Sequence, residues 1–256
     1  MISKATRFLK RQVMRLEEKK LVRKIPQDKS ELINSIKRNK LTYLSRGRLA
    51  SIVETILDLK NSGREGLLIE AGCALGGSSV LIGHTKNTES PFRIYDVFGM
   101  IPPPTEEDEE SIHKRYLTIK DGKSKGIDGD PYYGYEDDLM GKVLDTFRNY
   151  GIDQKKHGVD LVKGLIQDTL LLNEPVIFAH VDVDWYDPVK TCLDRIWPHL
   201  IVGGVIILDD YQDWGGCRKA TDEFLLKWKD YVKLSDKFGS LKITKISSES
   251  NTVEPV

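Results

Sequence analysis

The sequence predicts one doubly wound α/β domain with a mostly parallel sheet, N-terminal helices and a lid insertion. After Gly63, short apolar runs alternate with helical patterns, which is typical of a parallel sheet with helices on both faces. Several of these runs end in a carboxylate or a glycine turn, as strands at a ligand-binding sheet edge often do. One long segment, 99–135, follows neither pattern and is therefore interpreted as an insertion.

The composition excludes several classes of protein. The 256 residues are 39% hydrophobic and 30% charged, as in an ordinary soluble protein. Thirty-nine basic residues balance thirty-nine acidic ones, so we expect no nucleic-acid partner. The three cysteines are too few and too far apart for a disulfide framework. No apolar run approaches the roughly 20 residues of a membrane span, and the amino terminus lacks a signal-peptide core, so we expect a cytoplasmic protein.

Residues 1–62 are predicted to form a helical extension, and residues 63–256 the α/β domain. Residues 1–48 contain fifteen basic residues against four acidic ones. Apolar residues in 1–24 recur at roughly helical spacing, which predicts a basic helix. This helix either packs on its own or a partner subunit, as in a homodimer or higher homo-oligomer, or makes peripheral contact with an anionic membrane. A second helix is predicted over 45–60.

Six strands are expected within the α/β domain. Five correspond to apolar runs and a sixth, placed at the other edge of the sheet, to a late apolar segment: 66–72, 92–98, 159–165, 176–183, 204–211 and 239–246. A helix should follow the fourth strand, with Asp187 capping its amino end and Pro188 in its first turn.

The insertion 99–135 begins with three prolines, continues with five acidic residues and ends rich in glycine and tyrosine. A segment this long inside a compact α/β domain is usually a functional lid or a disordered loop. It follows the second strand and therefore leaves from the carboxyl edge of the sheet, where open α/β proteins bind ligands.

The first candidate ligand site is the turn Glu70–Ser78, which joins a strand to an apolar helix and contains three glycines. Glycine allows the backbone to approach a ligand closely, and a helix amino end offers free N–H groups. Asp96 closes the second strand, where an acidic residue suits hydrogen bonds to ribose hydroxyls. The alternatives are an ordinary tight turn and, for Asp96, a turn or helix cap.

Four carboxylates at two strand ends form the second candidate site. Asp182 and Asp184 are two residues apart on one expected strand, so their side chains should share a face. Asp209 and Asp210 end the next strand. Crowded carboxylates repel unless a cation or protons neutralise them, and an oxygen-only set suits Mg²⁺, Mn²⁺ or Ca²⁺ better than zinc. The alternative is that some of them cap helices.

Taken in order, these motifs resemble the macrocin O-methyltransferase family, which methylates sugar hydroxyls of macrolide and aminocoumarin antibiotics. The resemblance implies an S-adenosylmethionine-dependent O-methyltransferase of the Rossmann-like type, acting on a sugar or a glycosylated small molecule. The matching segments are Glu70–Ser78, Asp96–Gly99, Asp182–Tyr186, Leu208–Tyr211 and Cys217–Ala220.

The same resemblance implies roles for individual residues. It implies that Asp182, Asp209 and Asp210 bind the metal and that Asp184 is the general base, with Asp182 beside it in the catalytic pair. The contacts it implies for S-adenosylmethionine are Glu70, Gly72, Gly76, Ser78, Asp96, Phe98, Gln167 and Asp168. Related catechol-type enzymes place a lysine where this chain has Trp185, which favours the sugar-modifying branch.

Other interpretations remain open at the level of sequence. His180, two residues before Asp182, is a rival base that should lie deeper in its strand. A Rossmann oxidoreductase is disfavoured because the glycine spacing differs from G-x-G-x-x-G and hydride transfer needs no carboxylate cluster. The second function to weigh is a methyltransferase-like binding or scaffold module docked through its basic N-terminal helix.

Overall fold

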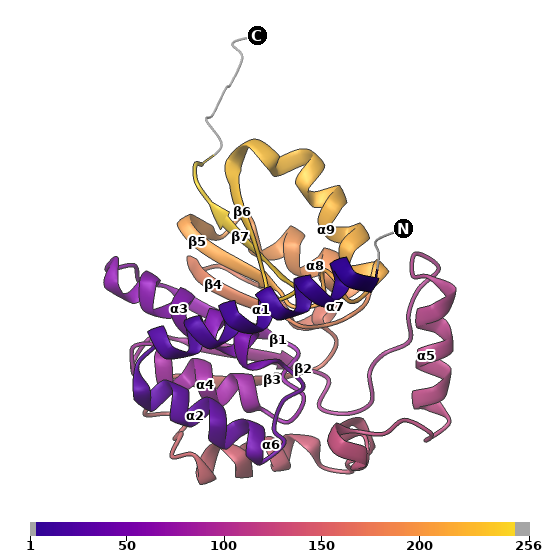
Figure 1. The fold of residues 1–256 in the computed structure, drawn as a ribbon. Coiled ribbons are helices and arrows are strands. Elements are labelled where there is room, and N and C mark those ends of the chain that lie inside the picture. Colours follow the sequence, from indigo (N-terminus) through magenta and orange to yellow (C-terminus); the bar gives the residue numbers. More distant parts are fainter. Residues whose placement is uncertain (1–3, 249–256) are drawn as a thin grey trace.

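A seven-stranded sheet forms the centre of the protein, with helices on both faces (Figure 1). The computed structural model describes residues 4–248, and side chains from Gln12 onward. The strands lie in the order β3-β2-β1-β4-β5-β7-β6. Their bounds are β1 Leu67–Ala71, β2 Phe92–Asp96, β3 Val159–Lys163, β4 Val176–Val181, β5 Leu200–Leu208, β6 Val232–Lys237 and β7 Ser240–Lys245. The doubly wound, mostly parallel fold predicted from the sequence is confirmed.

Strands β1 to β5 pair in parallel, whereas β7 pairs antiparallel with both β5 and β6. The late strand expected at the edge is β7, and that placement is wrong, because β6 covers it and forms the edge. The missed strand β6 buries only Val232, so its sequence lacks the apolar run that marks the central strands. Strand β5 also begins earlier than expected, at Leu200.

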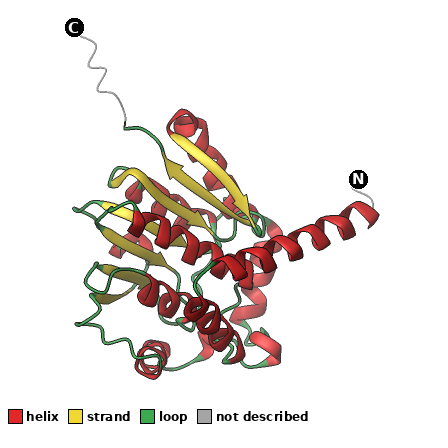
Figure 2. Ribbon diagram, turned by 60° about the vertical axis from the view of Figure 1, so that its left-hand side comes forward, coloured by secondary structure: helices red, strands yellow, loops and turns green. Residues whose placement is uncertain are grey.

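Helices α1 to α4 and α6 pack on one face of the sheet, and α7 to α9 on the other. Their bounds are α1 Lys4–Lys24, α2 Gln27–Arg38, α3 Arg46–Asn61, α4 Gly77–Thr85, α6 Leu139–Asn149, α7 Ile166–Thr169, α8 Tyr186–Ile196 and α9 Gly215–Trp228. Side chains of α2 and α3 belong to the same hydrophobic core as the sheet residues Leu68 and Phe178. Helix α1 extends beyond the body at its amino end (Figure 2). Within residues 4–248, no helix is long and apolar enough to cross a membrane.

Helices α3 and α8 begin at residues that differ in how they cap the helix. Ser45 caps α3 as its position suggests, because its hydroxyl accepts a hydrogen bond from the Arg48 N–H at 3.2 Å. For α8 the expected cap was wrong. Trp185 is the N-cap residue, and Asp187 lies inside the first turn with Pro188, where an acidic side chain still favours the helix dipole.

The insertion 99–135 is ordered and lies over the carboxyl edge of the sheet. It contains helix α5, Glu110–Lys120, and two short 3₁₀ turns, η1 Ile127–Gly129 and η2 Tyr133–Tyr135. The insertion begins with a prolyl stretch, residues 102–104. The carbonyl of Pro102 accepts a hydrogen bond from the indole N–H of Trp185 at 3.0 Å. The buried Asp108 accepts the N–H of Tyr186 at 2.9 Å, so the insertion is fastened to the start of α8.

Candidate functional site

The sheet pairing itself positions the acidic residues. The Asp182 N–H donates to the Ala71 carbonyl at 2.8 Å, and the Asp209 N–H donates to the Val181 carbonyl at 3.0 Å. The parallel ladder therefore continues one residue beyond the last paired positions of β4 and β5. This fixes both backbones, so the two carboxylates leave adjacent strands at the same edge.

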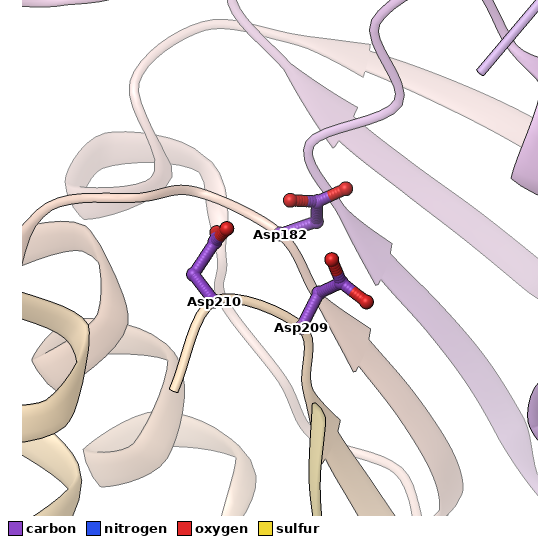
Figure 3. Close-up of side chains that lie close together, drawn as sticks. All are labelled: Asp182, Asp209 and Asp210. Atoms are coloured by element: carbon purple, nitrogen blue, oxygen red, sulfur yellow. The ribbon is translucent and has the colours of Figure 1, made fainter. Parts of the chain in front are cut away.

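Asp182, Asp209 and Asp210 form the acidic cluster, in which one carboxylate oxygen of each residue lies within 4.8 Å of the others. Figure 3 shows the three side chains converging in front of the strand ends. Burial, reinforced by the neighbouring negative charges, raises the pKa of Asp182 and of Asp210 well above the ordinary range. Two of the three carboxylates therefore favour a proton or a cation.

Asp209 has a different environment, which the sequence did not predict. Its Oδ2 accepts Arg48 Nη1 at 2.6 Å and its Oδ1 accepts the Ser240 hydroxyl at 2.8 Å. The His180 ring lies 3.9 Å from Oδ1, an electrostatic contact rather than a hydrogen bond. Burial opposes ionisation of Asp209, but these partners outweigh it and lower the pKa of this carboxyl. Asp209 is thus ionised and fixed in orientation.

Glu70 lies behind the acidic cluster, wholly buried. Its carboxylate accepts the Ser79 hydroxyl and contacts His180 Nδ1 at 3.1 Å. Burial disfavours the charged imidazole, but Asp209 and Glu70 raise the pKa of His180 to about 9. Glu70 and His180 are paired residues of the neighbouring strands β1 and β4, so the buried imidazole of His180 lies between the carboxyl groups of Glu70 and Asp209.

This arrangement buries two of the candidate residues. Glu70 was expected to contact the cofactor, but both of its oxygens are engaged inside the protein and its side chain is 0% exposed. His180 was the rival base, but its ring is also 0% exposed and held between two carboxylates. The imidazole of His180 lies between Glu70 and Asp209 and favours the ionised form of Asp209. The sequence contains a signal for these buried positions. Glu70 lies two residues before Gly72, and His180 lies two residues before Asp182, so each is inside its strand rather than at the strand end.

Asp184 does not share a strand face with Asp182, because β4 ends at Val181 and the chain turns at Asp184 with φ 58°. The Asp184 N–H donates to Asp210 Oδ2 at 3.2 Å. Burial and the charge of Asp209 raise the pKa of Asp184 to about 6, although a hydrogen bond from Trp214 opposes the shift. The expected same-face geometry was therefore wrong, yet Asp184 remains beside the acidic cluster.

Two cavities meet at these residues. One, called the apolar cavity, is lined by the strand ends, by the prolyl stretch and by the start of α7, with Gly72, Asp96, Ile101, Pro102, Ile166, Gln167 and Val183 among its residues. The other, called the acidic cavity, contains the acidic cluster together with Tyr43, Arg48, Arg115, Tyr132, Asp213 and Trp214. Their shared wall includes Gly72, Asp96, Tyr133, Asp182, Asp184 and Trp185. The two cavities thus adjoin at Asp182 and Asp184.

The predicted cofactor contacts divide into two groups. Gly72, Asp96 and Gln167 line the apolar cavity. Asp96 accepts the N–H groups of Cys73 at 2.8 Å and Phe98 at 2.7 Å, so its carboxylate also holds the turn, as the capping alternative expected. The residues that do not line either cavity are Glu70, Gly76, Ser78, Phe98 and Asp168. Gly76 caps α4, Ser78 and Phe98 are buried, and Asp168 faces solvent.

Gly72 allows the closest backbone approach in the site. It has φ 82°, and a Cβ added there would lie 1.9 Å from the Asp182 carbonyl oxygen. We expect Gly72→Ala to lower the free energy of unfolding by roughly 3 kcal/mol or more, since it adds backbone strain to a clash with main chain.

Urea unfolding followed by tryptophan fluorescence measures this change. Gly99→Ala is the matched control, because Gly99 also lines the apolar cavity but an added Cβ would meet no atom closer than 4.0 Å. That variant should stay within about 1 kcal/mol of the wild type. Equal losses in the two variants would contradict the steric explanation.

Comparison with known proteins gives a consistent family assignment. The family model described as macrocin-O-methyltransferase (TylF) matches residues 3–236. The demethyldecarbamoylnovobiocin O-methyltransferase of Streptomyces niveus is 24% identical over 202 residues, covering 74% of this chain and 70% of that protein. Among solved structures, the O-methyltransferase NovP aligns with a TM-score of 0.67 at 22% identity, covering 81% of this chain and 83% of its own. The calicheamicin methyltransferase CalS11 aligns at 0.57 and 15% identity, covering 94% and 93%.

Proposed function

Because this chain belongs to the macrocin O-methyltransferase family, we propose that it transfers a methyl group from S-adenosylmethionine to a hydroxyl of a sugar or glycosylated small molecule, with the help of a divalent cation. The observation that carries this proposal is the wall shared by the two cavities, which includes Asp182 and Asp184. Group transfer requires two substrates in direct contact. A second CalS11 structure is described as that of a TDP-rhamnose 3'-O-methyltransferase, which supports a sugar-bearing acceptor.

The apolar cavity fits S-adenosylmethionine. Val183, Ile101 and Ile166 offer apolar surface for a nucleobase, and Gln167 offers an amide for its polar edge. Asp96 stands at the end of β2, where a carboxylate suits the ribose hydroxyls. The donor supplies a methyl group already activated by its sulfonium charge. The buried carboxylates nearby provide a negative environment that suits such a cation.

The acidic cluster fits Mg²⁺ or Mn²⁺. Its donors are oxygens only, and burial together with the neighbouring negative charges raises the pKa of Asp182 and Asp210, so a cation would stabilise their ionised forms. Arg48 and Ser240 each donate one hydrogen bond to the Asp209 carboxylate and so fix its orientation. Each oxygen keeps a further lone pair that can bind a cation. A bound divalent cation would make a nearby hydroxyl easier to deprotonate.

The protein groups then have distinct tasks. Asp184 accepts the proton of the acceptor hydroxyl, and its pKa of about 6 leaves it ionised at neutral pH. Trp185 and Tyr133 contribute aromatic surface to both cavities, which excludes water from the point of transfer. The insertion, fastened to α8 through Asp108, closes the site above them.

A thermal-shift measurement with S-adenosylhomocysteine tests the proposed function. A ligand at 100 times its Kd adds about 2.7 kcal/mol to the unfolding free energy, and so raises the Tm by several degrees. We expect that rise in the wild type and its loss in Asp96→Asn. Asp168→Asn is the matched control, because this predicted contact is exposed and outside the cavity. Absence of stabilisation in the wild type would refute the proposal.

A further inference from the structure

Arg115 extends from helix α5 of the insertion to the wall of the acidic cavity. Its side chain is partly buried, and among residues 12–248 no hydrogen bond or ion pair satisfies its guanidinium. Arg48, the other cation lining this cavity, differs in this respect, because its guanidinium binds Asp209 and Asp213, each at 2.6 Å. Water can reach this partly exposed guanidinium, but its five N–H donors are all available to an anionic ligand.

Both aromatic and acidic groups lie near Arg115, since its charge acts on the phenols of Tyr43 and Tyr132 and on the carboxyl of Asp184. Burial raises the pKa of Tyr43 and of Tyr132, and the positive charge of Arg115 opposes both shifts, which places the guanidinium close to the two phenols. Ile119, one turn further along α5, lines the same cavity. Most of the carboxylates in this cavity follow the ends of β4 and β5, and Asp96 ends β2. The cavity thus has a cationic wall on the insertion and an acidic wall on the sheet.

We propose that Arg115 binds an anionic group of the acceptor, a phosphate or a carboxylate, so that the preferred acceptors are phosphorylated or acidic sugars. The proposal rests on the proposed function, since it concerns the acceptor of that reaction. Six aspartates line the acidic cavity and would repel an anion approaching from the sheet side. An anionic acceptor is therefore oriented, with its charged group toward the insertion and a hydroxyl toward Asp184. Arginine suits either anion because its planar fork binds both in a bidentate manner.

A purely electrostatic role is the competing explanation, because the charge of Arg115 also lowers the pKa of Asp184. Such a role would act on every acceptor alike. Recognition of an anion acts only on charged acceptors. The two explanations therefore differ in acceptor selectivity, which binding measurements detect without any turnover.

Isothermal titration calorimetry with the full chain, saturated with S-adenosylhomocysteine and Mg²⁺, is the test. The probes are glucose 1-phosphate, glucuronate and the neutral methyl glucoside. We expect at least one anionic probe to bind the wild type more tightly than methyl glucoside, and R115Q to weaken that probe roughly ten- to a hundredfold, the usual range for a charged hydrogen-bonding pair. R115K, which keeps the charge but not the fork, should give a smaller loss.

K114Q is the matched control, because Lys114 is the preceding residue of α5 but is exposed and paired with Glu110. It removes the same charge and should leave all three affinities unchanged. The proposal is overturned if no anionic probe exceeds methyl glucoside in the wild type, if the preference survives in R115Q, or if K114Q loses it equally. Preference for one anionic probe identifies the group as phosphate or carboxylate. Saturation by S-adenosylhomocysteine is recorded first in each sample, so its failure would refute the proposed function separately.

Discussion

Replacing Asp184 with asparagine is expected to lower turnover roughly 10²–10⁴-fold, the usual contribution of a positioned general base. The amide keeps the size of the side chain but accepts no proton from the acceptor. The backbone N–H that donates to Asp210 is untouched, so the acidic cluster should keep its geometry. Affinities for S-adenosylhomocysteine and for Mg²⁺ should therefore remain near those of the wild type.

The pH profile makes this prediction sharper. Because the pKa of Asp184 is about 6, the base is protonated below that pH and ionised above it. Wild-type turnover should rise with pH through about 6 and then level off, and Asp184→Asn should lack this acid limb. Asp194→Asn is the control, since it removes an exposed carboxylate paired with Lys190 on α8. Near-normal turnover in Asp184→Asn would contradict the assignment of the base.

Excess chelator is expected to abolish methyl transfer, and Asp210→Asn is expected to weaken Mg²⁺ binding while stabilising the metal-free protein. Burial raises the pKa of Asp210 in the folded state above that of the unfolded chain, so its ionisation at pH 8 opposes folding. The asparagine removes that charge and still offers an oxygen to the Asp184 N–H. The Tm of the metal-free variant should rise by a few degrees, about 2–4 °C for each kcal/mol.

Calorimetric titration with Mg²⁺ and thermal unfolding in chelator measure the two effects. The stabilisation should shrink as the pH falls toward 4, because the carboxyl of the unfolded chain, whose ordinary pKa is 3.8, then also begins to bind a proton. Full turnover in excess chelator would contradict the metal requirement. A metal-free Asp210→Asn protein less stable than the wild type at pH 8 would contradict the electrostatic explanation.

The central strands could be predicted from the sequence because β1, β2 and β4 are buried on both faces and therefore consist of apolar runs. Helix α2 was missed because it buries only Ile33 and Ile36 among polar residues. Strand β6 was missed for the same reason, since a solvated edge strand needs little apolar surface. Elements that contribute few side chains to the core leave little trace in hydrophobic periodicity.

The acidic cluster could be predicted because its members follow strands whose carboxyl ends must meet at one edge. The position of Asp184 could not, since the sequence does not show that β4 ends at Val181 and that the chain turns three residues later. Nor could the role of Arg48, which lies 161 residues from Asp209 and carries no motif. Contacts of such separation depend on the finished fold.

The groups that hold Asp209 come from both ends of the domain. Arg48 belongs to the third helix, whereas Ser240 begins the last strand and the Phe238 carbonyl fixes Arg48 at 3.1 Å. Loop-closure entropy disfavours such distant contacts until the chain between them has folded. Strands β1 to β5 all precede Ser240, which lies 31 residues after Asp209 in the chain. The parallel strands are therefore complete in the sequence before the last of the groups that fix this carboxylate.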